Sequence, residues 1–352
     1  MTRRTLASVI AAVLLVVLLV VAFTRPVGYV IFQPGPTINV LGLNDNKKII
    51  DVTGHKVYPD KGGLRLVTII PSGPDERVSL VSAIEAWINP DQAVYPHDAV
   101  YAPTDNTKTV EAQSSQEMVS SQDNAVAAAL HALHITFGKV VEVAAVDKGG
   151  PADGKLKVND RILKVNGVAT PTTASLIKAV QGLPPGSHVD LQIRRNEKVQ
   201  DVELTTVPSV TNKNQSAVRI QIGVGYDFPF NVALRLDKNI GGPSAGLMFS
   251  LGVYDVLTPG SLTEGKVIAG TGEIDAAGNV GEIGGIQQKL VGAQHDGARL
   301  FLVPAGNCAE ALGGNYDPNK MRLVKVNKMA DALSDVKAWV KNPDAALPKC
   351  TR

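Results

Sequence analysis

The feature that most constrains this chain is a glycine-rich loop that leads straight into an apolar segment. Residues 239–246 read Asn-Ile-Gly-Gly-Pro-Ser-Ala-Gly, and Leu-Met-Phe-Ser-Leu-Gly-Val-Tyr follows directly. Pro243 suits the first turn of a helix, because the N–H that it lacks would have no partner there. The pattern predicts a buried helix that begins at Ser244. Free backbone N–H groups and the positive end of the helix dipole would then stabilise an anion developing on a bound carbonyl.

A lysine further along the chain has surroundings that suit a general base. A serine hydroxyl becomes a good nucleophile only when a base removes its proton, and a lysine can do this when burial lowers its pKa towards neutrality. The lysine is Lys289, and Gly284-Gly285 ahead of it would let a helix start close to the serine loop. Its apolar neighbours are Ile283, Ile286, Leu290 and Val291. Thr271, in a Gly-Thr-Gly turn, is suited to hydrogen-bond the lysine and orient it.

Together these segments resemble the Lon-type serine-lysine peptidases. Pro-Ser-Ala-Gly, Thr-Gly-Glu-Ile and Gly-Gly-Ile-Gln-Gln-Lys occur in that family's order and at about its spacing. The resemblance implies Ser244 as the nucleophile, Lys289 as the general base and Thr271 as the partner of the lysine. The expected oxyanion donors are the backbone N–H groups of Gly242, Ser244 and Ala245. Gly241 departs from the family, because many energy-dependent members carry an acidic residue at that position.

A second interpretation of the serine loop stays open. Residues 242–246 also fit the G-x-S-x-G elbow of the α/β-hydrolases. That fold requires an acid and then a histidine further along the chain, and Asp275 and His295 stand in that order. The hydrolase interpretation leaves Thr-Gly-Glu-Ile and the glycine pair before Lys289 unexplained, so we favour the serine-lysine pair.

The middle of the chain, from about residue 138 to 209, changes to short strands around glycine turns. Its run Gly-Lys-Leu-Lys-Val-Asn-Asp-Arg-Ile-Leu-Lys-Val-Asn-Gly, after Pro-Ala, resembles the PDZ domain family. The resemblance implies that residues 136–208 capture a peptide by β-strand addition between a strand and a helix. The family's Gly-Leu-Gly-Phe loop is replaced by His-Ile-Thr-Phe-Gly at 134–138. In the alternative, this module packs against the protease and gates it without binding a peptide.

An apolar segment near the N-terminus predicts a membrane anchor. Arg3 and Arg4 precede the uncharged residues 5–24, and about 20 residues at ~1.5 Å each span the ~30 Å core of a bilayer. Because positively charged flanks stay in the cytoplasm, the chain after Arg25 would form the extracytoplasmic body of a single-pass cell-membrane protein. A cleaved signal peptide is the alternative, since Val20 and Ala22 fit a small-residue cleavage site.

The two cysteines, Cys308 and Cys350, both lie in the C-terminal part of the chain. In an oxidising compartment, a disulfide between them would tie the tail to the protease domain. Two free thiols are the alternative, although we favour the bridge.

Composition and spacing argue against other ligands. A net charge of +2 gives no nucleic-acid surface. His131 and His134 lie on a helix predicted at 117–134, after a polar linker at 102–113, but no Cys, Asp or Glu supports them as metal ligands. Residues 260–266 match most of a P-loop, yet Val267 replaces the Ser or Thr that would hold Mg²⁺. We therefore expect no metal, ATP or other cofactor.

The whole sequence predicts an α+β protein with an N-terminal transmembrane helix, a PDZ-like β-rich domain and a Lon-type α+β proteolytic domain. The expected segments are the cytoplasmic tip and membrane helix (1–25), a membrane-proximal first part of the protease domain (26–135), the inserted PDZ-like domain (136–208), the proteolytic domain (209–345) and a tail (346–352). The predicted function is ATP-independent cleavage of unfolded or flexible extracytoplasmic or membrane-proximal protein segments, and the family resemblance favours a homo-oligomer. A membrane-anchored PDZ adaptor without catalysis is the alternative class.

Overall fold

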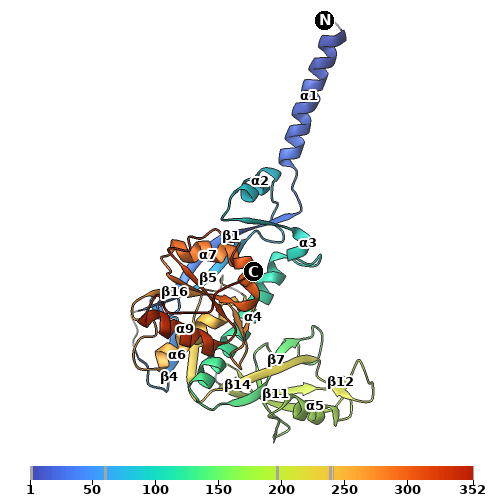
Figure 1. Ribbon diagram of the computed structural model, residues 1–352. Helices are drawn as coiled ribbons and strands as arrows, with labels where there is room; N and C mark the ends of the chain where they lie inside the picture. The colour runs from blue at the N-terminus through green and yellow to red at the C-terminus, as the bar shows by residue number, and fades with distance from the viewer. Residues whose placement is uncertain (1–2, 59–61, 196–197, 238–239, 241, 352) are drawn as a thin grey trace. The chain divides into compact units, whose positions relative to one another are not determined.

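The computed structural model describes residues 3–58, 62–195, 198–237, 240 and 242–351. The chain forms two compact units, whose elements are labelled in Figure 1. The larger unit combines Met1–His134 with Asn231–Arg352, and the smaller unit, Ile135–Phe230, is inserted between these two parts. An insertion of this kind is what the sequence favours.

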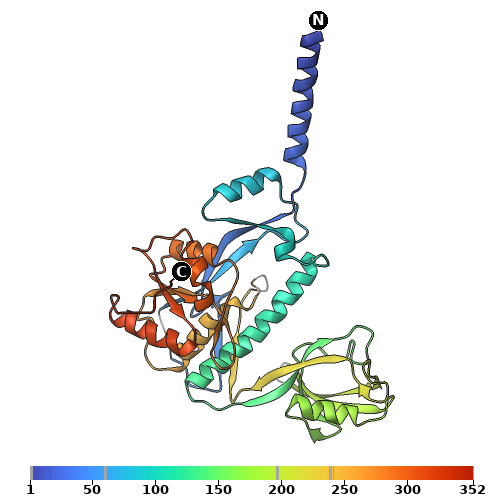
Figure 2. The ribbon, with the colours of Figure 1, turned by 45° about the vertical axis from the view of Figure 1, so that its right-hand side comes forward.

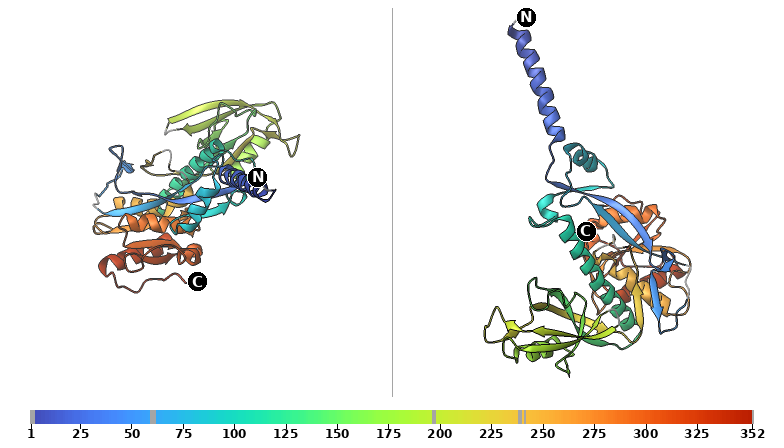
Figure 3. Two further views of the ribbon diagram at one scale, coloured as in Figure 1. Left: turned by 90° about the horizontal axis from the view of Figure 1, so that it is seen from above. Right: turned by 180° about the vertical axis from the view of Figure 1, so that it is seen from behind.

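The larger unit is built on a mixed six-stranded sheet. In order across the sheet, its strands are β20 (Arg322–Val326), β19 (Leu300–Pro304), β16 (Val267–Gly270), β5 (Gly63–Pro71), β1 (Tyr29–Asn39) and β6 (Ala93–Pro96). The first four strands run parallel to one another, whereas β1 is antiparallel to both of its neighbours. The long strands β1 and β5 run side by side in Figure 3. A register shift between Pro34 and Thr37 bends β1 without ending it.

Two helices, α6 (Gly246–Leu257) and α7 (Ile286–His295), cover opposite faces of this sheet. Successive side chains of a strand point to opposite faces of its sheet. Neighbouring residues of β19 therefore contact the helices on different faces. Phe301 belongs to the apolar cluster that includes the buried residues of α7. Leu302 points to the other face, where it and Met248 of α6 border the same glycine of β16. Because both faces are covered, β19 is buried along its whole length.

One long helix, α4 (Thr107–Ala132), crosses the larger unit and is clear in Figure 2. The sequence predicted a helix from residue 117 after a polar linker at 102–113. The linker prediction was wrong for its second half, because Asn106 and Thr109 form a capping box that starts the helix earlier. In the C-terminal half of α4, the apolar residues from Ala125 to Leu130 are buried.

Apart from α1, the larger unit has four further helices and six further strands among the described residues. The helices are α2 (Leu80–Ile88), α3 (His97–Val100), α8 (Cys308–Ala311) and α9 (Met329–Lys341). The strands are β2 (Leu43–Asn44), β3 (Lys47–Lys48), β4 (Ile50–Thr53), β15 (Asn231–Leu234), β17 (Glu273–Ile274) and β18 (Val280–Gly281).

The first helix, α1 (Arg3–Thr24), is 22 residues long. Its residues Arg3–Val21 are long and apolar enough to cross a membrane, and none of this stretch is buried in protein. The helical prediction for this segment is therefore confirmed.

The smaller unit contains a six-stranded sheet that packs on a helix, α5 (Thr173–Gln181). In order across the sheet, the strands are β11 (Lys198–Thr205), β10 (His188–Arg195), β8 (Arg161–Val165), β7 (Gly138–Val146) and β14 (Ile220–Asp227). Strand β9 (Val168–Ala169) pairs with β8, and β12 (Val207–Pro208) pairs with β13 (Ser216–Ala217).

The smaller unit ends at Phe230, not at the expected boundary of 208. The sequence assigned the strand after residue 217 to the protease domain. In the structure that strand is β14, which pairs antiparallel with β7 from one end to the other. The extra strand extends the unit because it completes the sheet edge next to β7.

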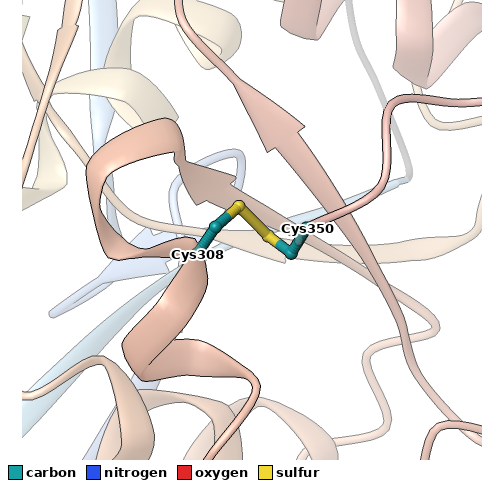
Figure 4. Close-up of a disulfide and its surroundings, with 2 residues drawn as sticks. All are labelled: Cys308 and Cys350. Carbon is teal, nitrogen blue, oxygen red and sulfur yellow. A yellow bond between two sulfur atoms is a disulfide. The ribbon is translucent and has the colours of Figure 1, made fainter. Parts of the chain in front are cut away.

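The structure contains the bridged form of the two cysteines. Cys308, at the start of α8, is joined to Cys350, with their Cα atoms 4.9 Å apart (Figure 4). The two cysteines are 42 positions apart, and the loop that the disulfide closes contains β20 and α9. The tail has further contacts besides the disulfide. Leu347 is buried, and the Lys325 N–H donates a hydrogen bond to the Pro348 carbonyl.

Replacing both cysteines should destabilise the full chain. Loop-closure entropy predicts that Cys308→Ser with Cys350→Ser lowers the free energy of unfolding by about 3–4 kcal/mol. Urea unfolding in detergent, followed by far-ultraviolet circular dichroism, measures this change. Dithiothreitol should destabilise the parent protein to the same extent and leave the double variant unaffected. Equal midpoints for the parent and the double variant under oxidising conditions would contradict the prediction.

Candidate active site

Ser244 lies where the chain turns into α6. A 3-10 turn, Pro243–Ala245, carries it, and Pro243 occupies the first position as predicted. Gly242 ahead of the turn has a φ of 88°, a conformation that favours glycine. Gly246 must also lack a side chain, because a Cβ there would lie 2.8 Å from Ser121 Oγ of α4 and from the Cγ2 atom of Ile274. The serine loop therefore packs closely against α4 and β17.

Hydrogen bonds hold the Ser244 carbonyl in place. It accepts a hydrogen bond of 2.8 Å from the Gly272 N–H and one of 3.0 Å from the Thr271 hydroxyl. The Gly272 carbonyl in turn accepts from the Leu247 N–H at 3.1 Å. The turn that contains Thr271 is thus tied to the serine loop on both sides, which fixes the position of Ser244 relative to Thr271.

The expected oxyanion donors need one correction. The Gly242 N–H donates to the Ser114 carbonyl of α4 at 3.1 Å, so it points to α4. The N–H groups of Ser244 and Ala245, at the start of α6, stay the candidates for this role. Gly241, where the family often carries an acid, lies outside the described residues.

Lys289 lies in the first turn and a half of α7 and is only 2% exposed. The helix starts close to β5 because Gly285 adopts a left-handed conformation, and a Cβ there would lie 3.0 Å from Ile69. Burial lowers the pKa of the Lys289 ammonium to about 7, and the carboxylates of Glu273 and Glu310 oppose this shift. A substantial fraction of the amine is therefore uncharged at neutral pH.

Thr271 connects the lysine to the serine loop. Lys289 Nζ donates to Thr271 Oγ1 at 3.2 Å, and Thr271 Oγ1 donates to the Ser244 carbonyl at 3.0 Å. Ser244 and Lys289 also line the same cavity, which has a volume of about 610 Å³. Among the hydrogen bonds of the described residues, none joins Ser244 Oγ directly to Lys289 Nζ. Hydrogen bonds of Thr271 thus connect the three residues that the sequence singled out, and two of them, Ser244 and Lys289, line one cavity.

Two carboxylates near the lysine were not assigned a role from the sequence. Glu273 lines the cavity, and its pKa is raised, first by partial burial and then by the neighbouring Glu117. The pKa of Glu310 on α8 is also raised, mainly by burial. The only sequence signal for Glu273 was its place in Thr-Gly-Glu-Ile, and no signal pointed to Glu310. Both groups favour the charged form of Lys289 and therefore limit how far burial lowers its pKa.

One edge of β5 faces the cavity. The neighbouring strand β16 pairs only with Gly63–Leu66, so residues 67–71 extend beyond it. Residues 66–70 line the cavity together with Ser244. A second cavity of about 810 Å³ continues from Ile69 and Pro71 to residues 107–115 of α4. Two cavities that share Ile69 in their linings therefore lie along this strand edge.

The residues of the hydrolase interpretation do not meet at the serine. Asp275 accepts hydrogen bonds from Asn279 in a turn beyond β17. His295 ends α7 with its side chain 87% exposed, beside Asp296. Neither residue lines the cavity of Ser244. The acid and histidine expected for an α/β-hydrolase are therefore absent from the described part of the site.

The lysine of the P-loop match, Lys266, contacts α9. Lys266 Nζ donates to the Val340 carbonyl at the end of α9 and lies over the ring of Trp339. Lys266 thus fastens α9 to the sheet, and the stretch leads into β16, where a P-loop would lead into a helix.

The smaller unit has a second strand edge with a helix beside it. Strand β14 is the last strand of its sheet, and α5 packs against it. Val224, near the middle of β14, is more than half exposed. The sequence placed the carboxylate-binding loop at 134–138, directly ahead of β7. In the structure, the edge strand next to β7 is β14, which comes from the C-terminal side of the unit.

Comparison with protein families gives two matches. Residues 238–341 match the Lon protease (S16) C-terminal proteolytic domain, and residues 111–206 match the PDZ domain. The first match spans the serine loop, Thr271 and Lys289. The second begins within α4 and ends before β14, so it does not contain the edge strand of the smaller unit.

Individual relatives agree with these matches. The Lon protease of Neorickettsia sennetsu is 32% identical over 94 residues, which are 26% of this chain and 11% of the relative. The Lon protease of Rhizobium meliloti is 33% identical over 95 residues, again 26% and 11% of the two chains. The aligned region thus spans about a tenth of the length of these relatives. Among solved structures, the PDZ domain of an SdrC-like protein from Listeria monocytogenes is 18% identical with a TM-score of 0.22, covering 24% of this chain and 86% of that one.

These matches support a serine protease that carries a PDZ domain. The chain joins matches to two known families in one polypeptide: residues 238–341 are similar to the Lon protease (S16) C-terminal proteolytic domain, and residues 111–206 are similar to the PDZ domain.

Proposed function

We propose that this chain is a serine endopeptidase in which Ser244 is the nucleophile and Lys289 the general base. The observation that carries this proposal is the buried Lys289 amine, with a pKa of about 7, in the same cavity as Ser244. An amine with this pKa can accept a proton at neutral pH and return it later in the reaction. A solvated lysine, with its usual pKa above 10, could not do so.

The reaction follows from the positions of these groups. Ser244 Oγ attacks the scissile carbonyl carbon while Lys289 Nζ takes the hydroxyl proton. The N–H groups at the start of α6 stabilise the oxyanion of the tetrahedral intermediate. The Lys289 ammonium then gives its proton to the leaving amine, and a water molecule releases the acyl group by the same path. Thr271 accepts a hydrogen bond from the lysine throughout and keeps the amine aimed at the serine.

The substrate would bind as an extended strand. Residues 67–71 of β5 offer backbone hydrogen bonds on the side that β16 leaves unpaired. A peptide added there would run along the two cavities towards α4 and pass Ser244. Strand addition requires an unfolded or flexible segment, because a folded substrate has already paired its own backbone groups.

The PDZ domain would select such segments. The edge of β14 beside α5 has the strand-and-helix arrangement that PDZ domains use for β-strand addition. An additional peptide strand would pair with β14 and contact Val224.

The setting of the enzyme follows from the N-terminal helix and from Lys266. We propose that α1 anchors the chain in the cell membrane, with the body on the extracytoplasmic side, because Arg3 and Arg4 precede the span. The disulfide fits an oxidising compartment. We also propose that cleavage by this chain needs no ATP, since the P-loop match ends in a lysine that is bound to α9.

Variants of the two catalytic residues test the mechanism directly. Ser244→Ala and Lys289→Ala should each lower kcat/KM for casein cleavage by the full chain by about 10³-fold or more. His295→Ala is the matched control and should retain activity, with or without ATP. Activity that survives in Lys289→Ala and is lost in His295→Ala would favour the hydrolase interpretation. A parent protein that neither cleaves casein nor reacts with an acylating probe would favour the adaptor.

The pH dependence of the rate tests the role of the lysine. The base must be uncharged, so kcat/KM should rise with pH through about 7 and then level off. Glu273→Gln removes a charge that favours the ammonium, and should move this rise to lower pH. Glu282→Gln is the control, because Glu282 is exposed and is not among the groups that shift the pKa of Lys289. An identical profile for the parent and Glu273→Gln would contradict this assignment.

A charge placed on the edge of β14 tests substrate selection. Val224→Asp should raise KM for unfolded protein substrates several-fold and leave kcat/KM for a short peptide unchanged, because only the first would use the PDZ domain. Val199→Asp is the matched control, since Val199 is similarly exposed on β11, at the opposite edge of the same sheet. Equal KM values for the two variants would show that the β14 edge does not select substrates.

A further inference from the structure

The helix α2 buries its small residues and exposes its large ones. Ala83 and Ala86 are buried against β1, together with Ile31. Trp87 and Ile88, in the last turn of the same helix, are 79% and 73% exposed. A helix that covers a sheet in a soluble protein normally does the reverse.

The exposed side of α2 carries an apolar stripe. Its members recur at the spacing of one helix face, and they are the half-buried Leu80 and the exposed Val81, Ile84, Trp87 and Ile88. Ser82 and Glu85, which are also exposed, lie outside this stripe. The face is therefore a built amphipathic surface, and a contiguous surface of this kind marks an interaction site.

Hydrogen bonds fix α2 next to the end of α1. The Val27 N–H donates to the Val78 carbonyl at 2.9 Å, and Pro26 forms a bridge with Ser79, the residue that caps α2. α1 ends at Thr24, and Pro26 of this bridge is two positions further along the chain. At ~3.6 Å per residue, Pro26 lies within about 7 Å of the end of α1, and an antiparallel pair adds about 5 Å to reach Ser79 at the start of α2. Figure 2 shows both helices and the link between them.

The chemistry around this point suits a lipid surface. Arg25 follows α1 directly, Arg77 comes shortly before α2, and both are exposed. Guanidinium groups pair well with lipid phosphates, and tryptophan prefers the boundary between headgroups and acyl chains. A helix with basic residues at its start and an apolar stripe with tryptophan has the composition of an interfacial helix.

We infer that α2 is an interfacial helix that lies on the bilayer in which α1 is anchored. Its apolar face, with Trp87 and Ile88, enters the boundary of the acyl chains, and Arg25 and Arg77 contact the phosphates. This inference rests on the proposed anchoring of α1. Because α2 packs on β1 and β6, at one edge of the six-stranded sheet, the contact would hold the larger unit at a fixed height above the membrane.

A second copy of the chain is a weaker candidate for this face. One side of a 9-residue helix is small compared with the ~800 Å² per partner of a stable protein interface. A bilayer needs no such minimum area, because α1 already supplies the anchoring and the helix has only to settle on the surface beside it.

Fluorescence quenching by brominated lipids tests this inference on the full chain in phospholipid vesicles. The chain contains two tryptophans, so Trp339→Phe leaves Trp87 as the only one. We expect its emission to be blue-shifted and to lose at least half its intensity when bromines are carried high on the acyl chains. The matched control is Leu43→Trp in a chain that lacks both native tryptophans. Leu43 is exposed on the β2–β3 hairpin of the same unit, and a tryptophan there should not be quenched.

Two results would overturn the inference. Trp87 emission that is equal in brominated and ordinary lipids would place the helix away from the bilayer. Emission that depends on the ratio of protein to lipid, but not on bromine, would assign the face to a second copy. Flotation of the same vesicles tests the anchoring by α1, and cleavage of a short peptide tests catalysis. Failure of either proposed function is therefore distinguishable from failure of the α2 contact.

Discussion

The burial of one amine is the constraint on which the active site depends. Lys289 loses its hydration because α7 packs close to β5, and desolvation disfavours the charged form of the amine. Two further features offset the cost of burying the Lys289 amine in the folded protein. Thr271 accepts a hydrogen bond from the amine, and the carboxylates of Glu273 and Glu310 remain near enough to compensate the ammonium when it forms. Burial and the two carboxylates thus shift the pKa of the amine in opposite directions.

Strand edges are the second theme of the structure. In the larger unit β5 extends past β16 beside the serine cavity, and in the smaller unit β14 ends its sheet beside α5. Each edge leaves backbone groups available for another strand. The β14 edge also has the helix α5 next to it, and the β5 edge borders the cavity that contains Ser244. A protein that handles flexible segments can use the same physical interaction, β-strand addition, for both selection and cleavage.

Much of the site could be read from local sequence, because short-range constraints govern it. Pro243 at the start of a helix, the glycine pair before Lys289 and the apolar run of α6 each follow from backbone and burial preferences. The long-range pairings were less accessible. Nothing near β14 in the sequence indicates that its partner is β7, and the Gly242 N–H was expected at the oxyanion until the structure placed it against Ser114.

The sequence by itself determined which residues are the candidates for catalysis, because the identity and order of the serine, threonine and lysine motifs carry that information. It also determined that the first helix is apolar enough to span a membrane, since length and composition decide this property. Only the tertiary structure decided that the lysine is dry, that Glu273 and Glu310 surround it, and that the large side chains of α2 point outward. These properties depend on tertiary contacts between segments that are distant in the sequence, and local sequence patterns do not predict such contacts.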